Sequence, residues 1–398
     1  MPKTAFDRAE YVERLSKTKG YMAAADLDLL IVSQPENMDY LSGYANQTYP
    51  FLGFIIVVPE DDEPLWLGRE STDMPAALLT SFMGRDRFIG YPESCHSGSE
   101  IWETNSDDTV ESFLANVLAE RGWEKRRIGL EVETSNLPAN FLQRIQNLLP
   151  DATLVQADGL GRRMRIVKSL KEVEYIRQAG VMVERAMDVA IASIAEGARQ
   201  CDTAAAAYQA LISGTPEFGG RIPEIEFTVG DRQPALRSLW TDEPYRQGEL
   251  ASLELFANRL GYKAAVTRSV SVGKPSDFVA NMMAVVIDAM HEASERIRPG
   301  ITYGQVGEMF HTAISRHGYE ARPGVGYSFN DWGDDAKAAW LAPGDDMVFA
   351  PNHIVHMIPI MRMENGDWSL SMSSTLRVME TGAPEQITSA PNQLIIKA

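Results

Sequence analysis

Apolar residues in the first 160 positions alternate between helical spacing and short continuous runs. A helical spacing covers residues 11–25, and strand-like runs occupy residues 29–33, 54–58 and 128–131. Segments of the two kinds that follow one another in this way are typical of an α/β unit. We therefore predict a small α/β domain over residues 1–160.

A basic, glycine-containing segment, GLGRRMRIVK at residues 159–168, separates this part from a long helical pattern. Ser169 and Glu172 form a capping box at the start of that pattern. Apolar or small residues then recur on one helical face, namely Val173, Ile176, Gly180, Val183, Met187 and Ile194. The pattern predicts a core-packing helix at the start of a second domain, residues 161–398.

The second half of the chain contains both helical and strand-like spacings of apolar residues. Helices are expected over 278–297 and 306–315, and Thr302 with Gln305 forms another capping box before the latter. Strands are expected at 226–229, 250–256, 266–272, 347–349 and 369–378. This arrangement predicts an α+β domain with a curved, mainly antiparallel sheet.

Composition and charge narrow the classes of function. Among 398 residues, 37 Lys and Arg face 55 Asp and Glu, so the formal net charge is −18. This acidic excess argues against a nucleic-acid partner. Two cysteines cannot form a disulfide framework, and neither lies in a zinc-binding spacing. The charged N-terminus and the absence of a long apolar run predict a cytoplasmic protein without a membrane partner.

Motifs for dinucleotides, nucleoside triphosphates, a serine nucleophile elbow and a zincin centre are absent from the chain. Of the histidines, His353 and His356 stand out, because they lie in the apolar run PNHIVHMIPIMR. On a strand these two positions point to opposite sides, which disfavours a shared metal ion. We expect one imidazole to enter a pocket as a proton donor or acceptor, and the other to be structural.

The stretch ASLELFANRLGYKAAVTRSVSVGKPS, residues 251–276, predicts two strands joined by a short turn at 258–261. Glu254 has the apolar neighbours Leu253, Leu255 and Phe256. One interpretation is a polar residue on an exposed strand face. The other is a partly desolvated, reactive carboxylate, which makes Glu254 a candidate nucleophile or base.

Three segments resemble the pita-bread superfamily, which includes methionine aminopeptidase, proline dipeptidase and creatinase. They are DLDLLIVSQPENMDYLSGY at 26–44, RIVKSLKEVEYIRQAG at 165–180 and GYKAAVTRSVSVGKPS at 261–276. The resemblance covers almost the whole chain. It implies a creatinase-like N-terminal domain followed by a pita-bread catalytic domain.

The departures from this superfamily concern its metal centre. Its metallopeptidases hold two metal ions through two aspartates, one histidine and two glutamates. The matching positions here are Glu254 and Ala265 for the aspartates, the vicinity of Val325 for the histidine, Asn352 or Ile358 for one glutamate, and the vicinity of Ser373 for the other. Because one of the five positions can still ligate, we expect no metal ion and no other cofactor.

This loss of ligands most resembles the metal-free ectoine hydrolase branch of the superfamily. The resemblance implies a cytoplasmic homodimer that opens the cyclic amidine ring of ectoine, with hydroxyectoine as a further candidate substrate. The product would be N-acetyl-2,4-diaminobutyrate, the substrate of a downstream deacetylase. The alternatives are a creatinase-like amidinohydrolase, an enzyme similar to Xaa-Pro peptidases, and a non-catalytic pita-bread binding module.

The resemblance also implies roles for the candidate residues. Glu254 would be the nucleophile, although the sequence equally allows a general base, and His353 or His356 would be the general acid. An aromatic set would surround the cationic ring, and it consists of Tyr49, Trp240, Tyr327, Phe329 and Trp332. The substrate carboxylate needs an arginine, for which Arg362, Arg322 and Arg237 are the candidates.

Overall fold

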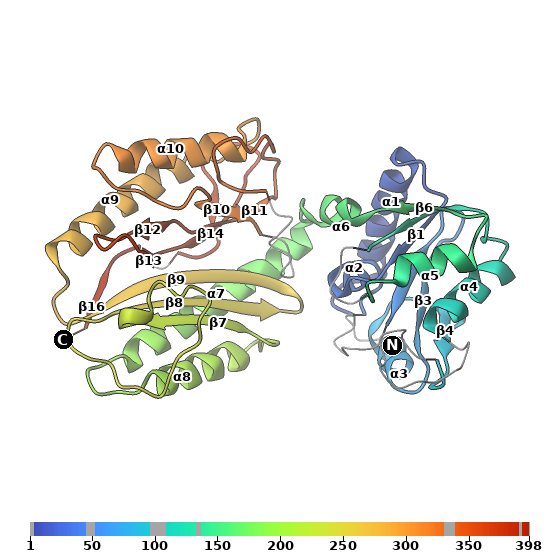
Figure 1. Ribbon diagram of the computed structural model, residues 1–398, viewed down its shortest axis with the longest axis horizontal. Helices are drawn as coiled ribbons and strands as arrows, with labels where there is room; N and C mark the ends of the chain where they lie inside the picture. The colour runs from blue at the N-terminus through green and yellow to red at the C-terminus, as the bar shows by residue number, and fades with distance from the viewer. Residues whose placement is uncertain are drawn as a thin grey trace. The chain divides into compact units, whose positions relative to one another are not determined.

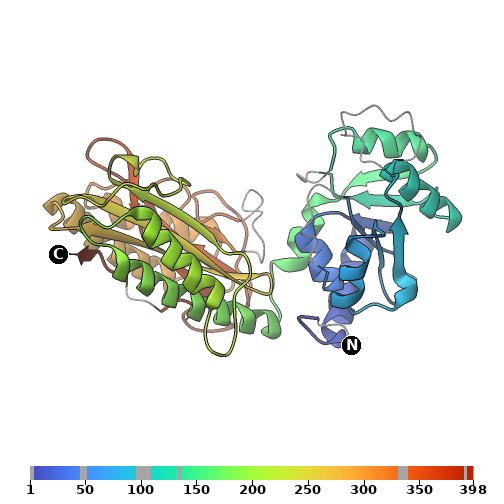
Figure 2. The same cartoon turned by 90° about the horizontal axis from the view of Figure 1, so that it is seen from below.

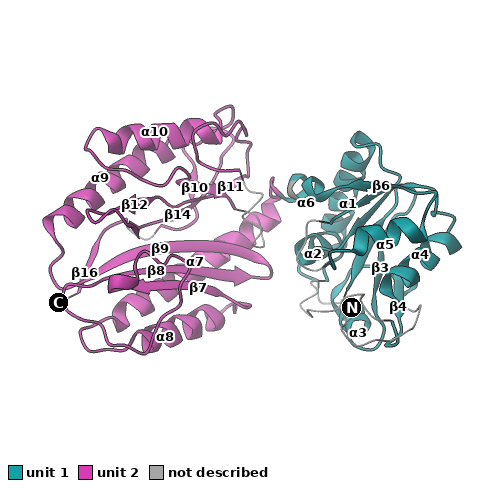
Figure 3. Ribbon diagram, viewed as in Figure 1, with its two compact units in different colours: residues 1–165 teal, residues 166–398 magenta. Residues whose placement is uncertain are grey.

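A computed structural model describes residues 4–44, 52–95, 109–132, 137–329, 339–389 and 392–397. The chain divides into two compact units, residues 1–165 and residues 166–398 (Figure 3). The boundary expected after residue 160 falls within helix α6 (Asp158–Arg165).

The described strands of the first unit form one mixed sheet in the order β4-β3-β2-β1-β5-β6. The strands are β1 (Leu29–Val32), β2 (Phe54–Val57), β3 (Leu65–Arg69), β4 (Phe88–Tyr91), β5 (Arg127–Leu130) and β6 (Thr153–Gln156). The helices are α1 (Arg8–Ala24), α2 (Pro35–Ser42), α3 (Asp73–Thr80), α4 (Val110–Glu120), α5 (Phe141–Leu148) and α6. Strand β2 is antiparallel to both of its neighbours, and the other pairs are parallel.

Both faces of this sheet are buried, which explains why its strands are continuous apolar runs. Leu29 and Ile31 of β1 pack in one cluster with residues of α4 and α5. Leu30 and Val32 point to the other face and pack with residues of α1 and α2. The predicted strands at 29–33, 54–58 and 128–131 are confirmed, with ends that shift by one residue.

The described strands of the second unit form two four-stranded sheets and one two-stranded sheet, and helices cover one face of each four-stranded sheet (Figures 1 and 2). One sheet has the order β16-β9-β8-β7 and packs against α7 (Leu170–Ser193) and α8 (Gln200–Ser213). Its strands are β7 (Glu224–Val229), β8 (Leu250–Arg259), β9 (Tyr262–Val272) and β16 (Ile395–Lys397). All pairs in it are antiparallel except β16 with β9.

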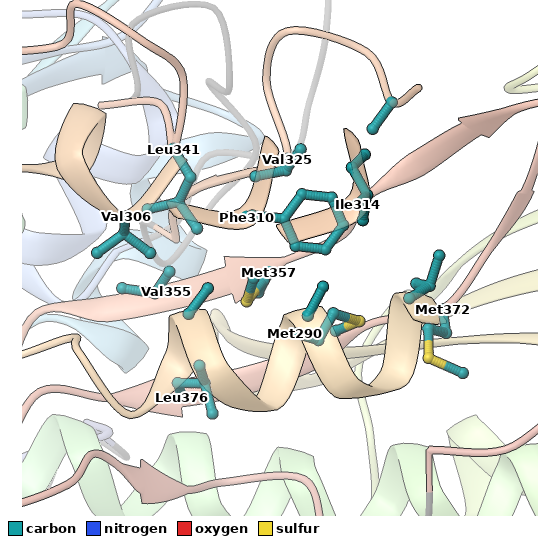
Figure 4. Close-up of a cluster of buried hydrophobic side chains, with 14 of the residues drawn as sticks. Met290, Val306, Phe310, Ile314, Val325, Leu341, Val355, Met357, Met372 and Leu376 are labelled. Atoms are coloured by element: carbon teal, nitrogen blue, oxygen red, sulfur yellow. The ribbon is translucent and has the colours of Figure 1, made fainter. Parts of the chain in front are cut away.

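The other sheet has the order β10-β11-β14-β15, and β12 pairs with β13 beside it. The strands are β10 (Gly326–Ser328), β11 (Ile354–Met357), β12 (Ile360–Arg362), β13 (Trp368–Ser371), β14 (Ser374–Arg377) and β15 (Glu385–Gln386). Helices α9 (Asp277–Ser294) and α10 (Tyr303–Ser315) bury their apolar faces against it. Figure 4 shows part of this core, where Met290 and Phe310 meet Met357 and Leu376.

Two local signals in the sequence form as predicted. The Ser169 hydroxyl accepts a hydrogen bond from the N–H of Glu172, and the Glu172 carboxylate accepts one from the N–H of Ser169. The strands β8 and β9 meet in a tight hairpin at Leu260 and Gly261, both with positive φ. This two-residue turn matches the twist of the strands and fixes their register.

Two expected strands differ from the structure. Residues 347–349 form no strand, because Val348 makes only an isolated bridge to Thr302 while the Phe349 ring stacks on Tyr303 at 4.0 Å. The expected strand at 369–378 is divided into β13 and β14. The chain breaks between them because Ser373 bonds to β9 instead of continuing the ladder. Among the described helices, none is long and apolar enough to cross a membrane.

Glu131 is a buried carboxyl group at the end of β5 in the first unit. It accepts hydrogen bonds from the backbone N–H groups of Ser33 and Gln34, each at 3.0 Å, and from the Asn37 amide. Burial raises the pKa of Glu131 to about 7, although these donors and the charge of Arg165 favour the ionised form. The group therefore favours the folded state most when it is protonated.

Replacing Glu131 by Gln is expected to change how stability depends on pH. The stabilisation from a raised pKa is complete below pH 4.5 and is lost as the pH rises through about 7. A shift of this size corresponds to on the order of 3 kcal/mol. Thermal unfolding of both proteins between pH 5 and pH 8 should therefore show the variant gaining relative stability as the pH rises. Parallel profiles would contradict this assignment.

Candidate active site

A cavity of about 560 Å³ lies over one face of the β7–β8–β9 sheet. Its floor consists of alternate residues of these strands, because successive side chains of a strand point to opposite faces. The floor residues are Glu224, Glu226, Thr228, Ser252, Glu254, Phe256 and Thr267. The other lining residues include Arg237, Arg322, Tyr327, Trp340, Ile358 and Ser371. The volume suits a small molecule.

Glu254 lies in the middle strand of this floor. It pairs across the sheet with Glu226 on β7 and with Thr267 on β9. Its side chain is 16% exposed, and its Oε1 atom lies 3.5 Å from Nε2 of His356. His356 belongs to β11 in the other sheet. The packing of the two sheets therefore brings the carboxylate and the imidazole together.

His356 is fully buried, and neither of its ring nitrogens has a hydrogen-bond partner among the described residues. The rings of Phe256, Tyr327 and Phe329 surround it, with centroids 6.1, 5.4 and 5.6 Å from that of the imidazole. Leaving a buried polar group without a partner costs roughly 1–3 kcal/mol. Such a cost requires an explanation, and the adjacent Glu254 carboxylate offers a catalytic one.

His353 has a different environment from His356. It is buried, and its Nδ1 atom lies 3.3 Å from the hydroxyl of Tyr303 on α10. It is not among the residues that line the cavity. Of the two histidines, the structure thus places His356 beside Glu254 and His353 against the helical layer.

Ala265 and Ser373 are two of the expected metal-ligand positions, and both have short side chains. Hydrogen bonds at these positions connect the two sheets. The Ala265 N–H donates to Thr375 Oγ1 at 3.1 Å, and the same hydroxyl donates to the Ala265 carbonyl at 2.9 Å. The Ser373 hydroxyl accepts from the N–H of Thr267 at 2.7 Å. These contacts place hydrogen bonds at two of the positions where the resemblance led us to expect the superfamily's carboxylate ligands.

The other expected ligand positions, Val325, Asn352 and Ile358, also lack a carboxylate or an imidazole. Val325 is buried in the hydrophobic core near Phe310 (Figure 4). The Asn352 amide oxygen accepts two hydrogen bonds from Arg377, and Ile358 contributes an apolar side chain to the cavity. In the part of the chain that the structure describes, no three His, Cys, Asp or Glu side chains could together hold a metal ion. The residues present therefore do not fit the two-metal centre.

The other candidate residues are distributed as follows. Tyr327 lines the cavity, whereas Phe329 packs behind it on His356. Trp240 packs edge-on against Tyr208 of α8. Tyr49 and Trp332 lie outside the described residues.

The three candidate arginines occupy two different environments. Arg362 forms an exposed ion pair with Glu320 at 2.7 Å and does not line the cavity. Arg237 and Arg322 are both exposed and both contribute to the cavity lining. Arg237 also has a φ of +68°, an uncommon backbone conformation for a residue other than glycine.

Sequence reasoning missed Glu226, Thr267 and Trp340, which line the cavity close to Glu254 or to Tyr327. The alternation in the segment EIEFTV places Glu224, Glu226 and Thr228 on one strand face. That signal alone could not show that Glu226 stands opposite Glu254. The register depends on a long connection between β7 and β8 rather than on a tight turn.

Two family models match the chain. The model of metallopeptidase family M24 matches residues 174–380, and that of the creatinase/prolidase N-terminal domain matches residues 14–167. The hydrolase/peptidase y4tM of Sinorhizobium fredii is 30% identical over 401 residues, which are 98% of each chain. The ectoine hydrolase of Halomonas elongata is 28% identical over 406 residues, again 98% of each chain.

A solved structure confirms the predicted fold class. The dipeptidase PepE from Mycobacterium ulcerans matches with a TM-score of 0.80 at 18% sequence identity. The match covers 98% of this chain and 99% of that chain. At this level of identity the likeness concerns the fold alone.

Replacing Thr375 by Val should destabilise the second unit. Both the N–H and the carbonyl of Ala265 would lose their hydroxyl partner in a fully buried place. We expect the free energy of unfolding to fall by about 1–3 kcal/mol in denaturant titrations. The matched control is Thr153→Val on the exposed side of β6, which should stay within about 0.5 kcal/mol of the parent. Equal stability of both variants would show that the joint contributes nothing.

Proposed function

Because the chain belongs to metallopeptidase family M24 as a hydrolase whose residues do not fit the family's metal centre, we propose that it opens the cyclic amidine ring of ectoine without a metal ion. The observation that carries this proposal is the Glu254 carboxylate facing a buried His356, whose ring nitrogens have no hydrogen-bond partner among the described residues, in an aromatic-walled cavity. This pair supplies a nucleophile and a proton carrier from the chain itself.

Ring opening consumes one water and breaks one carbon–nitrogen bond. We assign Glu254 as the nucleophile that adds to the amidine carbon. His356 gives its proton to the ring nitrogen that leaves, and the carbon–nitrogen bond then breaks. Water then adds to the same carbon and returns a proton to His356, and the bond between that carbon and the Glu254 oxygen breaks. This step frees the Glu254 carboxylate and leaves the amide of N-acetyl-2,4-diaminobutyrate, and the positive charge of the amidinium ends on the freed ammonium group.

The cavity also suits the two charges of ectoine. Its positive ring can lie against the faces of Tyr327 and Trp340, which line the cavity and pack together with ring centroids 5.3 Å apart. For the carboxylate we favour Arg237 or Arg322 over Arg362, because the first two line the cavity. The similarity to ectoine hydrolase over almost the full length supports the same substrate.

Purified, EDTA-treated protein should convert ectoine to N-acetyl-2,4-diaminobutyrate in an NMR assay. Hydroxyectoine, creatine and an Xaa-Pro dipeptide should be tested alongside. Activity on the dipeptide alone, dependent on added Mn²⁺, would replace the proposal with a peptidase function. Release of urea from creatine would indicate an amidinohydrolase, and binding without any product would indicate a binding module.

Single substitutions should separate the two histidines. His356→Gln is expected to reduce kcat by about 10²–10⁴-fold, the usual contribution of a general acid. Glu254→Gln should abolish measurable turnover while the circular dichroism spectrum is unchanged. His353→Gln should retain most of kcat but lower the melting temperature, because its ring packs against Tyr303. If His353→Gln lost turnover while His356→Gln kept it, the assignment of the general acid would be reversed.

A further inference from the structure

Arg237 lies in the loop that follows β7, and it lines the cavity. Its φ of +68° falls in the left-handed region, where any residue with a Cβ atom is strained. Strained conformations of this kind persist only when the surrounding structure holds them, and they cluster at ligand-binding sites. The place of Arg237 in the cavity lining therefore gives its backbone conformation a functional reading.

Hydrogen bonds directly after Arg237 hold the loop against β7. The N–H of Ser238 donates to the carbonyl of Ala235 at 3.1 Å. The carbonyl of Ser238 accepts a hydrogen bond from the N–H of Phe227 at 2.9 Å. These two contacts close a turn around Arg237 and tie it to the strand, so they maintain the positive φ.

Gln233 anchors the beginning of the same loop. It is 6% exposed, and its side-chain amide donates to the carbonyls of Thr228 and Leu250 at 3.0 and 2.9 Å. Thr228 belongs to β7 and Leu250 to β8, the strand that also carries Glu254. The loop is thus fixed to the strand of the proposed nucleophile, and the backbone of Arg237 keeps a constant place relative to Glu254.

The Arg237 side chain is accessible to an anion. It is exposed, and among the described residues no ion pair or hydrogen bond engages its guanidinium group. Arg362, by contrast, is paired with Glu320 at 2.7 Å. A guanidinium group presents a planar fork of N–H donors, which matches the two oxygens of a carboxylate.

Arg322 is the other cationic side chain among the described residues that line the cavity. Its N–H donates to the carbonyl of Ile360 at 2.9 Å, and it has no positive φ. Its backbone is therefore attached to β12, and its separation from Glu254 depends on the contact between different sheets. Of the two arginines, Arg237 is better placed to hold a ligand group at a fixed distance from Glu254.

We propose that Arg237 determines specificity for ligands that carry a carboxylate, and that its strained loop holds the guanidinium group in place for this purpose. Two parallel N–H groups of Arg237 donate to the carboxylate oxygens, and the residue takes no part in bond making. The choice of a carboxylate as the anion rests on the proposed function. The anion-binding role itself rests on the cavity lining and on the backbone conformation.

The test compares ectoine with 2-methyl-1,4,5,6-tetrahydropyrimidine, which is the same ring without the carboxylate. Calorimetry on Glu254→Gln protein measures binding without turnover. Ectoine should bind roughly 10- to 100-fold more tightly than the bare ring, the gain expected for charge-assisted hydrogen bonds. Adding Arg237→Gln should remove this preference without weakening the binding of the bare ring, and Arg237→Lys should keep part of the preference. In the active protein, Arg237→Gln should lower kcat/KM for ectoine by a similar factor.

The other two arginines provide the comparison. Arg362→Gln removes an exposed arginine outside the cavity lining and should leave both affinities unchanged. Arg322→Gln should lose less of the preference than Arg237→Gln. A larger loss in Arg322→Gln, or a preference that survives in Arg237→Gln, would overturn the inference even if ectoine is converted. Ectoine that binds with this dependence on Arg237 but stays intact in the active protein would refute the proposed function and leave the inference standing.

Arg237→Gly separates a ligand-binding role from a purely structural one. Glycine relieves the strain at positive φ, so this variant should melt about 2 °C higher than the parent while it loses the preference for ectoine. Asp26→Gly is the matched control, because Asp26 also has a positive φ of 54° but lies in the first unit. It should leave the preference unchanged. A lower melting temperature in Arg237→Gly would show that the side chain supports the loop, and it would overturn the inference.

Discussion

The hydroxyl groups of Thr375 and Ser373 join the two sheets of the second unit, and the candidate site depends on this joint. Thr375 is the direct strand partner of His356, and its hydroxyl holds the backbone of Ala265 on β9. Ser373 holds Thr267, which is the strand partner of Glu254. The separation between imidazole and carboxylate therefore follows from hydrogen bonds between these hydroxyl groups and the backbone of β9.

The same positions support the proposal that this M24 fold uses its own side chains for the reaction. Alanine at 265 and serine at 373 leave room for direct contact between the sheets. Glu254 and Glu226 line the cavity, and Glu254 lies beside an imidazole enclosed by aromatic rings. The rings shield the imidazole from water, which strengthens its electrostatic interaction with the neighbouring carboxylate.

Much of the fold could be predicted from local sequence, and the site only in part. The capping box at Ser169, the buried face of α7 and the tight turn at Gly261 depend on neighbouring residues, so they were visible. The strand predicted from the apolar run at 347–349 is wrong, because Phe349 packs on Tyr303 and the segment joins no sheet. Glu254 could be selected from its apolar neighbours, but its partners depend on strand register and on the contact between sheets, which no single segment encodes.

The central claim is that the Glu254 carboxylate attacks the substrate directly. The most direct test is to mix the metal-free protein with excess ectoine, quench in acid within the first turnover, and map the peptides by mass spectrometry. The account predicts that the peptide containing Glu254 gains the mass of one ectoine molecule and loses it again as product appears. Consumption of ectoine in the same samples with an unmodified Glu254 peptide at every time point would contradict it.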